Sequence, residues 1–358
     1  MADGDLLPRS YREARSGFLE AAAAAGARVS STAHAARGID DEDLAIDVAE
    51  VGAADADRVV VIVSGTHGVE GYLGSALQRQ HLTALSGTEH EGPTLVFVHA
   101  LNPFGFSWVR RVNEDNVDLN RNFIDWAQPP VANPEYGELA DVVVPGDWSA
   151  ETQEQTFLAM AAKLEEVGID RLQQIVSGGQ YTHPTGVFYG GTAPVWSHEW
   201  LRRFLAERLA GVERAAIIDL HTGLGPWGHG ELISSVQPDS ETYARQVEWW
   251  GDVTSLHDGS SVSAQIAGDW LDAAPGFAPG TEVTGIAIEY GTVDSITVLQ
   301  SLRADAVLHA SGDPTAPEAA AIRDQVRAAF LDDDPSWLAT CSDRYRSVVA
   351  AAQANLAG

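Results

Sequence analysis

Residues 59–71 have the sequence V-V-V-I-V-S-G-T-H-G-V-E-G, a run of apolar, mostly β-branched residues that stops at a polar turn. An unbroken apolar run of this kind predicts a strand covered on both faces, as in a parallel α/β sheet. His67 lies in the turn, and Glu70 follows at the start of a helix expected over 72–85. Open α/β sheets bind ligands at the carboxyl ends of their strands. An imidazole and a carboxylate three residues apart at such an end can hold one cation together.

The elements expected around this stretch alternate between strands and helices. The order strand 59–63, helix 72–85 and strand 94–99 predicts a βαβ unit with neighbouring parallel strands. Further strands are expected over 28–31, 44–48, 186–191, 215–220, 231–236 and 282–290. Further helices are expected over 10–27 (with Ser10 as N-cap), 153–175, 196–209, 241–250, 295–309, 316–331 and 343–356. Residues 100–148 are rich in Asn, Pro, Asp and Gly, which predicts a long functional loop.

This order of elements predicts an α/β protein. We expect residues 1–358 to form a single domain, closed by C-terminal helices that pack on it from about residue 294. The single cysteine, Cys341, excludes an intrachain disulfide and a cysteine-based zinc cluster. No apolar run approaches the roughly 18 residues of a membrane span. The first residues lack the basic and then apolar pattern of a signal peptide, so we expect a cytoplasmic protein.

The charge of the chain is strongly acidic. There are 22 Lys and Arg residues against 51 Asp and Glu residues, a formal net charge of −29, and Lys163 is the only lysine. Such a surface disfavours nucleic acids and anionic membranes, which bind clustered basic side chains. The composition reflects either nucleotide bias in an ordinary soluble protein or adaptation to a salty cytoplasm, where screening makes self-repulsion tolerable. Loss of stability in molar KCl would exclude the second interpretation.

A second motif, D-L-H-T-G at 219–223, places His221 where an apolar strand gives way to a glycine-containing turn. Together, His67, Glu70 and His221 make a set of three protein ligands that leaves a fourth position open for water. This is the composition of a catalytic zinc site rather than a structural one.

Positive charge is concentrated in residues 102–123, which contain Arg110, Arg111 and Arg121 among several amides. A planar guanidinium binds a carboxylate through two parallel hydrogen bonds, or stabilises charge that develops on a carbonyl oxygen. The alternative is that these arginines only offset nearby acids.

Glu289, in G-I-A-I-E-Y-G at 285–291, ends an apolar strand, where a carboxylate is costly unless something requires it. Beside a zinc site it can act as a general base and then return the proton to a leaving amine. The alternative is a hydrogen-bonded acid at a strand end.

The combined order of these motifs resembles a known family. His-x-x-Glu, Asn-Pro-x-Gly, an arginine, Asp-Leu-Asn-Arg-Asn-Phe, a strand-end His and a strand-end Glu follow one another over about residues 59–291. This order is similar to that of the zinc metallocarboxypeptidases, and most similar to their bacterial and archaeal carboxypeptidase-like and acyl-amino-acid deacylase relatives. The segment D-L-N-R-N at 118–122 is the most specific part. The resemblance implies a mixed, twisted sheet of about eight strands, flanked by helices on both faces.

The resemblance also implies roles for individual residues and one bound zinc ion. The implied zinc ligands are His67, Glu70 and His221. The implied general base is Glu289, and the implied oxyanion-stabilising group is Arg111. The implied substrate carboxylate site is Asn120 with Arg121, and Asp118 would bond the far ring nitrogen of His67 and fix its tautomer.

One feature departs from the family pattern. Classical members bring a tyrosine onto the substrate from a mobile loop between the third ligand and the base. Here the only tyrosine between His221 and Glu289 is Tyr243, within an expected helix. Tyr181 and Tyr189, in a glycine-rich segment, are the alternatives, and we take Tyr181 as the candidate substrate-binding residue.

The predicted function is a zinc-dependent, carboxypeptidase-like hydrolase that cleaves a C–N acyl bond, peptide or amide. Its substrate would be a small peptide or an N-acyl amino acid with a free carboxylate. The alternatives are an N-acyl-amino-acid deacylase of the aspartoacylase type and, from another class, a non-catalytic relative that binds metal or peptides. Gly-x-Gly-x-x-Gly at 223–228 is followed by a turn into an expected strand, which argues against a dinucleotide site. The sequence leaves the oligomeric state open.

Overall fold

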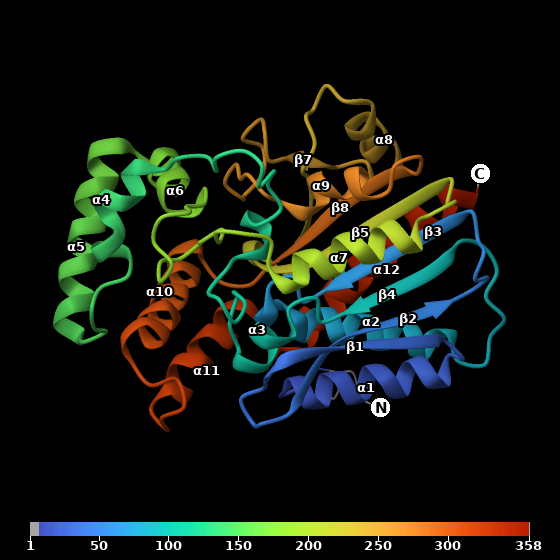
Figure 1. The fold of residues 1–358 in the computed structure, drawn as a ribbon, viewed down its shortest axis with the longest axis horizontal. Coiled ribbons are helices and arrows are strands. Elements are labelled where there is room, and N and C mark those ends of the chain that lie inside the picture. Colours follow the sequence, from blue (N-terminus) through green and yellow to red (C-terminus); the bar gives the residue numbers. More distant parts are fainter. Residues whose placement is uncertain (1–6, 358) are drawn as a thin grey trace.

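The computed structural model describes residues 7–357 and contains one eight-stranded mixed sheet (Figure 1). The order of the strands across the sheet is β1-β2-β4-β3-β5-β8-β6-β7. The strands are β1 (Arg28–Arg37), β2 (Asp43–Val51), β3 (Arg58–Ser64), β4 (Thr94–His99), β5 (Arg214–Trp227), β6 (Gly230–Ser234), β7 (Thr254–Ser255) and β8 (Glu282–Gly291). The four central strands β4, β3, β5 and β8 run parallel, and β2 and β6 flank them in antiparallel pairing. The predicted fold class and the βαβ unit are therefore confirmed.

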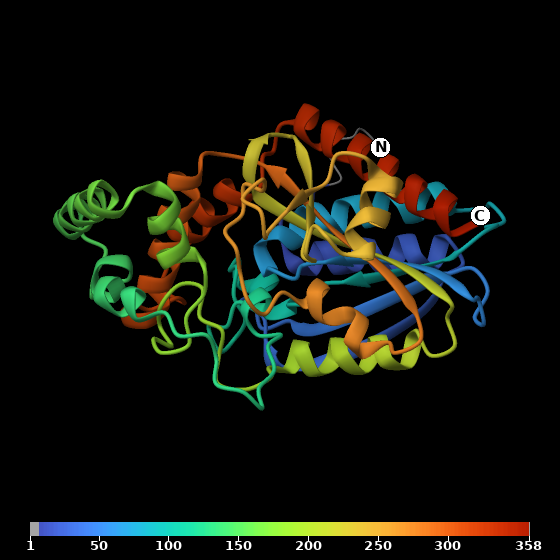
Figure 2. The same cartoon turned by 90° about the horizontal axis from the view of Figure 1, so that it is seen from above.

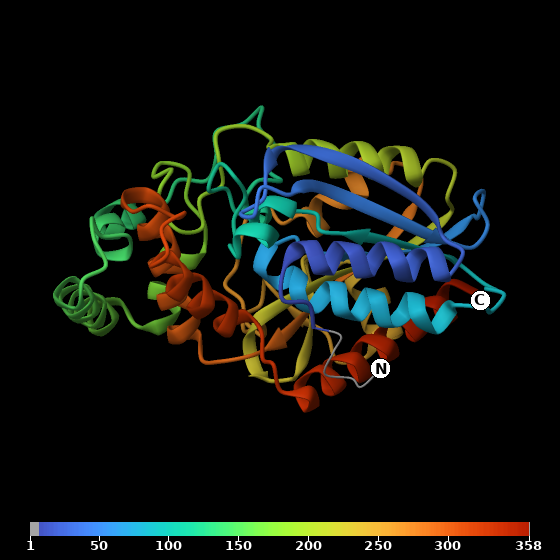
Figure 3. The ribbon, with the colours of Figure 1, turned by 90° about the horizontal axis from the view of Figure 1, so that it is seen from below.

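Helices cover both faces of this sheet (Figures 2 and 3). On one face lie α1 (Tyr11–Ala24), α2 (Gly71–Leu85), α8 (Glu241–Trp250) and α12 (Pro335–Ala357). On the other face lie α7 (Trp196–Arg208) and α9 (Trp270–Phe277). None of the helices within residues 7–357 has the length and apolar character needed to cross a membrane.

The apolar run of β3 is buried from both sides. Val59, Val61 and Val63 belong to the core beneath α7 and α9. Val60 and Ile62 belong to the other core, which includes α1, α2 and α12. Successive side chains of a strand point to opposite faces, and burying each of these contributes about 2 kcal/mol. The covered strand predicted from residues 59–63 is confirmed.

The remaining helices lie beyond the carboxyl ends of the central strands, at the left of Figure 1. They are α3 (Pro103–Trp108), α4 (Pro134–Val143), α5 (Ala150–Val167), α6 (Ile169–Ser177), α10 (Ser295–Ser311) and α11 (Ala319–Phe330). Arg303 of α10 holds α4 and α5 in place, because its guanidinium donates to the carbonyl oxygens of Val142 and Val143 and to Thr156 Oγ1.

Several predictions of local structure are wrong. Residues 100–148 are not one loop, because Pro103 and Pro134 each begin a helix. Asn102 and Asn133 cap these helices, each accepting a hydrogen bond from a backbone N–H of the first turn. The helix expected over 153–175 is divided at Gly168, whose φ of 80° ends α5.

Three further predictions of local structure differ from the structure. Residues 186–191 form no strand, only a single bridge between Gln180 and Tyr189. The last helix begins at Pro335, eight residues before the expected start, with proline again in the first turn. The helix α9 and the two-residue strand β7 were not predicted.

Candidate metal centre and substrate pocket

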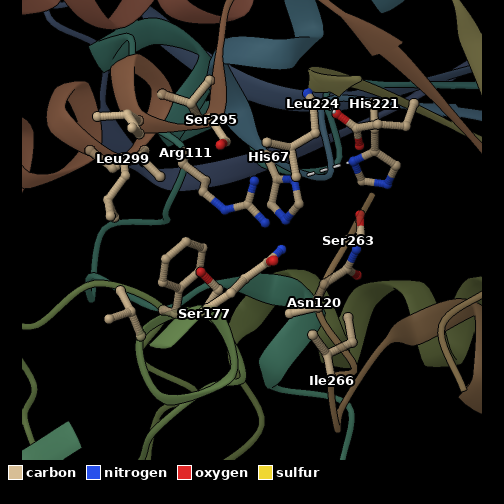
Figure 4. Close-up of a pocket in the computed structure, with 18 of the residues that line it drawn as sticks. His67, Arg111, Asn120, Ser177, His221, Leu224, Ser263, Ile266, Ser295 and Leu299 are labelled. Carbon is tan, nitrogen blue, oxygen red and sulfur yellow. Dashed lines mark hydrogen bonds between the residues drawn. The ribbon is translucent and has the colours of Figure 1, made fainter. Parts of the chain in front are cut away.

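The three predicted metal ligands converge at the carboxyl ends of β3 and β5. Their ligand atoms all lie within 4.8 Å of one another, and all three side chains are buried. Glu70 Oε1 lies 2.9 Å from His67 Nδ1, and Glu70 Oε2 lies 2.8 Å from His221 Nδ1. The two Nδ1 atoms are 3.2 Å apart (Figure 4). Since Ser64 pairs with Leu220 across the two strands, the residues that follow them share one edge of the sheet.

The backbone of the first motif is held by close packing. Gly68 begins a short 3₁₀ helix (Gly68–Glu70), and its N–H donates to the carbonyl oxygen of Arg111 over 3.1 Å. A Cβ atom at Gly68 would lie 2.0 Å from the backbone carbon of Gly105 in α3. Only glycine permits this approach, which sets the His67–Glu70 turn against the arginine-containing segment.

Each imidazole uses its far nitrogen to bond a buried carboxylate. His67 Nε2 lies 3.2 Å from Asp118 Oδ1, as predicted from the resemblance. His221 Nε2 lies 2.6 Å from Asp219 Oδ2, a partner that was not predicted. Asp219 lies two residues before His221 on the same strand, and alternate side chains of a strand share one face of the sheet. This spacing alone could have predicted the contact between them. Donation from Nε2–H to a carboxylate leaves the Nδ1 lone pair directed at the centre of the site.

The arrangement fits a metal ion. Each imidazole donates its Nε2–H away from the site, so the two Nδ1 lone pairs and the Glu70 carboxylate point toward one place. A cation bound there would accept all of these lone pairs. The carboxylates around the site also affect the protonation of His221. Burial favours the neutral form of His221, but Asp219 and Glu70 outweigh it and raise its pKa well above the usual range. Two histidine nitrogens and a carboxylate are ligands that zinc accepts, and carboxylates that bond the far nitrogens orient such ligands.

Glu289 lies beside this site and forms no ion pair within the described residues 7–357. It is the register partner of His221 across β5 and β8, and Glu289 Oε1 accepts a hydrogen bond of 2.9 Å from the Leu224 N–H. Its side chain lines the cavity described below. Burial and the charge of Glu70 together raise the pKa of Glu289 to about 7. A carboxylate at this place can take and return a proton near neutral pH.

The three arginines of residues 102–123 have different surroundings. Arg110 is buried against Asp305 of α10 at 2.9 Å and does not line the cavity, so it offsets a nearby acid. Arg111 lines the cavity, donates to Asp118 Oδ2 over 2.9 Å and to Glu70 Oε1 over 3.1 Å. Its Nη2 group has no hydrogen-bond partner in residues 7–357, so it is free to meet a substrate oxygen.

Arg121 and Asn120 also line the cavity. The guanidinium of Arg121 donates to the carbonyl oxygens of Asn120 and Ser177, and lies 5.3 Å from the centre of the Phe188 ring. Arg121 Nε and Asn120 Oδ1 are both buried and have no hydrogen-bond partner among residues 7–357. Unpaired buried polar atoms beside a cavity indicate a site for a polar ligand group.

Tyr181 does not line the cavity. Its hydroxyl donates to the carbonyl oxygen of Arg121 over 2.7 Å, so it supports the arginine from behind. Tyr243 donates its hydroxyl to the Val253 carbonyl oxygen from helix α8, and Tyr189 is likewise away from the cavity. Within residues 7–357 no tyrosine lines this cavity, and the direct substrate contact expected of Tyr181 has no geometric support.

One cavity of about 370 Å³ joins the metal-ligand set to a second wall (Figure 4). His67 and His221 lie at one end in this view, Ser295 and Leu299 of α10 lie at the other, and Arg111 lies between them. The second wall consists mainly of apolar side chains from α5, α6 and α10. No motif of the sequence predicts this wall, because it consists of three helices that are distant from the motifs along the chain.

Comparisons with known proteins identify one matching family model and several solved structures with a similar fold. The family model described as Protein of unknown function (DUF2817) matches residues 8–344. No curated protein sequence matches the chain.

Solved structures resemble the chain over most of its length. Bovine thrombin-activatable fibrinolysis inhibitor, in complex with tick carboxypeptidase inhibitor, shares 12% identity over 97% of both chains, with a TM-score of 0.49. Murein-tripeptide amidase MpaA from Escherichia coli O157 shares 14% identity over 78% of this chain and 91% of that one, with a TM-score of 0.40. Succinylglutamate desuccinylase from Chromobacterium violaceum shares 14% identity over 89% of this chain and 77% of that one, with a TM-score of 0.39. At these identities and scores, the solved structures assign no reaction to this chain.

Proposed function

The chain belongs to the family described as Protein of unknown function (DUF2817), and from its site we propose that it is a zinc-dependent hydrolase of C–N acyl bonds. The substrate would be a small peptide or an N-acyl amino acid that bears a free carboxylate. One observation carries the proposal: two carboxylate-bonded imidazoles and Glu70 converge on one point, with the cavity-lining carboxyl group of Glu289 beside it.

His67, Glu70 and His221 would hold the zinc ion. When bound there, zinc supplies polarisation of the scissile carbonyl and lowers the pKa of a coordinated water. Asp118 and Asp219 keep the two imidazoles in the tautomer that directs Nδ1 inward.

Glu289 would perform the proton transfers. It would take a proton from the attacking water as the new C–O bond forms. It would then deliver that proton to the nitrogen as the C–N bond breaks, so that a carboxylic acid and a free amine are released. The Leu224 N–H holds one oxygen of Glu289, which leaves the other to act as the base.

Arg111 and Arg121 would divide the recognition of the substrate's oxygens. The free Nη2 group of Arg111 would stabilise the negative charge that develops on the carbonyl oxygen. Arg121 and Asn120, with their unpaired buried atoms, would bind the free carboxylate. In a chain with a net charge of −29, these guanidinium groups give the pocket a local affinity for anions.

The proposal is tested by metal content and by a substrate panel. The purified protein should bind one zinc ion per chain and, when loaded, hydrolyse at least one member of a panel of N-acyl amino acids and short peptides. The matching substrates with the carboxylate converted to an amide should react more slowly. Zinc binding without any turnover on the panel would favour the non-catalytic relative instead.

A further inference from the structure

The wall opposite the metal centre contains apolar side chains that are open to solvent. Among residues 7–357, ten large hydrophobic side chains are exposed, and four of these line this single cavity. They are Phe157 (53% exposed), Leu164 (38%), Ile169 (63%) and Ile296 (63%). Exposed apolar side chains gathered in one place indicate a binding surface, whereas scattered ones need no explanation.

This wall is continuous with the proposed catalytic groups. The cavity that contains His221, Glu289 and Arg121 also contains Met160 of α5 and Leu299 of α10. Figure 4 shows Leu299 on the far side of Arg111 from His221. A molecule bound at the metal centre therefore meets an apolar channel that leads away from it, between α5–α6 and α10.

Several polar side chains of the channel already have hydrogen-bond partners. Arg303 donates to four oxygens of α4, α5 and α10, including Gln300 Oε1. Gln173 Nε2 donates to the Val262 carbonyl oxygen. A peptide in the channel would bring its own backbone N–H and C=O groups, each of which needs a partner when it is buried. A hydrocarbon chain needs none.

From this geometry we propose that the channel binds a long aliphatic chain, and that the substrate is an N-acyl amino acid with a fatty acyl group. The proposal rests on the proposed function and specifies its substrate class. The amino acid carboxylate would lie at Arg121 and Asn120, and the scissile amide at the metal centre. The acyl chain would run past Leu299 toward the exposed rim at Phe157, Leu164 and Ile169. Water remains the co-reactant, and the products are a fatty acid and an amino acid.

A homologous series tests the proposal. N-acetyl, N-butanoyl, N-octanoyl and N-dodecanoyl derivatives of one amino acid are compared below their micelle concentrations. kcat/KM should rise by up to about fourfold for each added methylene until the channel is filled, which corresponds to the free energy of burying that group. A flat or falling series, or a preference for peptides over every acyl derivative, would overturn the proposal.

Adjacent residues of α5 provide a matched control. Phe157 lines the channel, whereas Leu158 is 61% exposed and does not. Phe157→Ser combined with Leu164→Ser should lower the ratio of dodecanoyl to acetyl kcat/KM by about tenfold or more. Leu158→Ser should leave this ratio unchanged. Ile169→Ser tests the same ratio from α6 and should also lower it. If Leu158→Ser lowered the ratio as much as the channel variants, the assignment of the channel would be wrong.

Binding measurements separate this inference from the proposed function. Calorimetry measures the affinity of the zinc-free protein for butanoate, octanoate and dodecanoate, and so tests the channel without any turnover. Affinity that rises with chain length, together with no hydrolysis of any substrate, would retain the channel and reject the hydrolase. Affinity that is independent of chain length, together with hydrolysis of short substrates, would reject the channel and retain the hydrolase.

Discussion

His221 of β5 and Glu289 of β8 are register partners and lie side by side on adjacent parallel strands. A proposed metal ligand and the proposed general base are therefore positioned by the hydrogen-bonded sheet rather than by a mobile loop. The remaining ligands come from the turn after β3, the next strand along. Placement on rigid elements is what a catalytic constellation requires, because small displacements of reacting groups reduce the rate strongly.

Replacing Glu289 with Gln should separate metal binding from proton transfer. The variant retains the size and one oxygen of the side chain but cannot accept a proton from water. We expect the zinc content to stay at the wild-type value and kcat to fall by about 10²–10⁴-fold. Glu231→Gln is the control, because Glu231 is the register partner of Glu289 on β6 and does not line the cavity. Near-normal turnover of the Glu289→Gln variant would remove Glu289 from the mechanism.

Replacing Asp219 with Asn should weaken the metal site without removing a ligand. The amide has the same shape but is a poorer acceptor for His221 Nε2–H, and it can stabilise the wrong tautomer. Zinc affinity measured by competition with a chelator should fall by about 10–100-fold. Asp47→Asn, which alters a buried carboxylate paired with Arg15, should not change it. An unchanged zinc affinity in Asp219→Asn would show that Asp219 is only a packing residue.

Replacing Arg121 with Gln should impair recognition of the substrate carboxylate. Loss of a charge-assisted hydrogen bond costs about 1.5–3 kcal/mol, which is about 10–100-fold in KM. The measurement is KM for a carboxylate substrate and for the same substrate capped as an amide. Only the first should change by this amount. If both substrates are affected alike, Arg121 acts on the fold of the loop rather than on the carboxylate.

Replacing Gly68 with Ala should disturb the metal site through the backbone. The added methyl group would lie 2.0 Å from the Gly105 carbon, so the 3₁₀ helix Gly68–Glu70 and α3 must separate. We expect a loss of about 1–3 kcal/mol in the free energy of unfolding and weaker zinc binding. Gly146→Ala is the control, because nothing lies within 4 Å of the added atom there. Wild-type zinc affinity and stability in Gly68→Ala would contradict the close approach.

His99 should make the stability of the protein depend on pH. Its ring is fully buried, and burial lowers its pKa to about 4, below the value of about 6.5 in an unfolded chain. Between these values the unfolded state binds more protons, so this contribution is present above pH 6.5 and is lost as the pH falls toward 4.

The measurement is the free energy of unfolding of the wild type and of His99→Gln at several pH values. The wild type should lose about 2 kcal/mol more than the variant between pH 7 and pH 4.5. His229→Gln, at an exposed histidine, should follow the wild type. Parallel pH profiles for all three proteins would show that His99 does not titrate in this way.

The sequence predicted those parts of the site that depend on local pattern. The alternation of strands and helices from 59 to 99 predicted the βαβ unit, and the glycine-containing turns after two apolar strands predicted where His67 and His221 lie. Asn102–Pro103 and Asn133–Pro134 were interpreted as loop signals, although the same residues cap helices. The pattern is ambiguous because asparagine favours both turns and helix N-termini.

By itself, the sequence determined the class of fold and indicated the candidate ligands and the candidate general base, because each of these depends on the order of residues along a strand and the turn after it. Only the tertiary structure decided which groups share one cavity. It placed Tyr181 behind Arg121 instead of in the pocket, and set α5, α6 and α10 around the channel. The physical reason is that side chains distant in sequence meet only after the helices pack, and no periodicity along the chain records that packing.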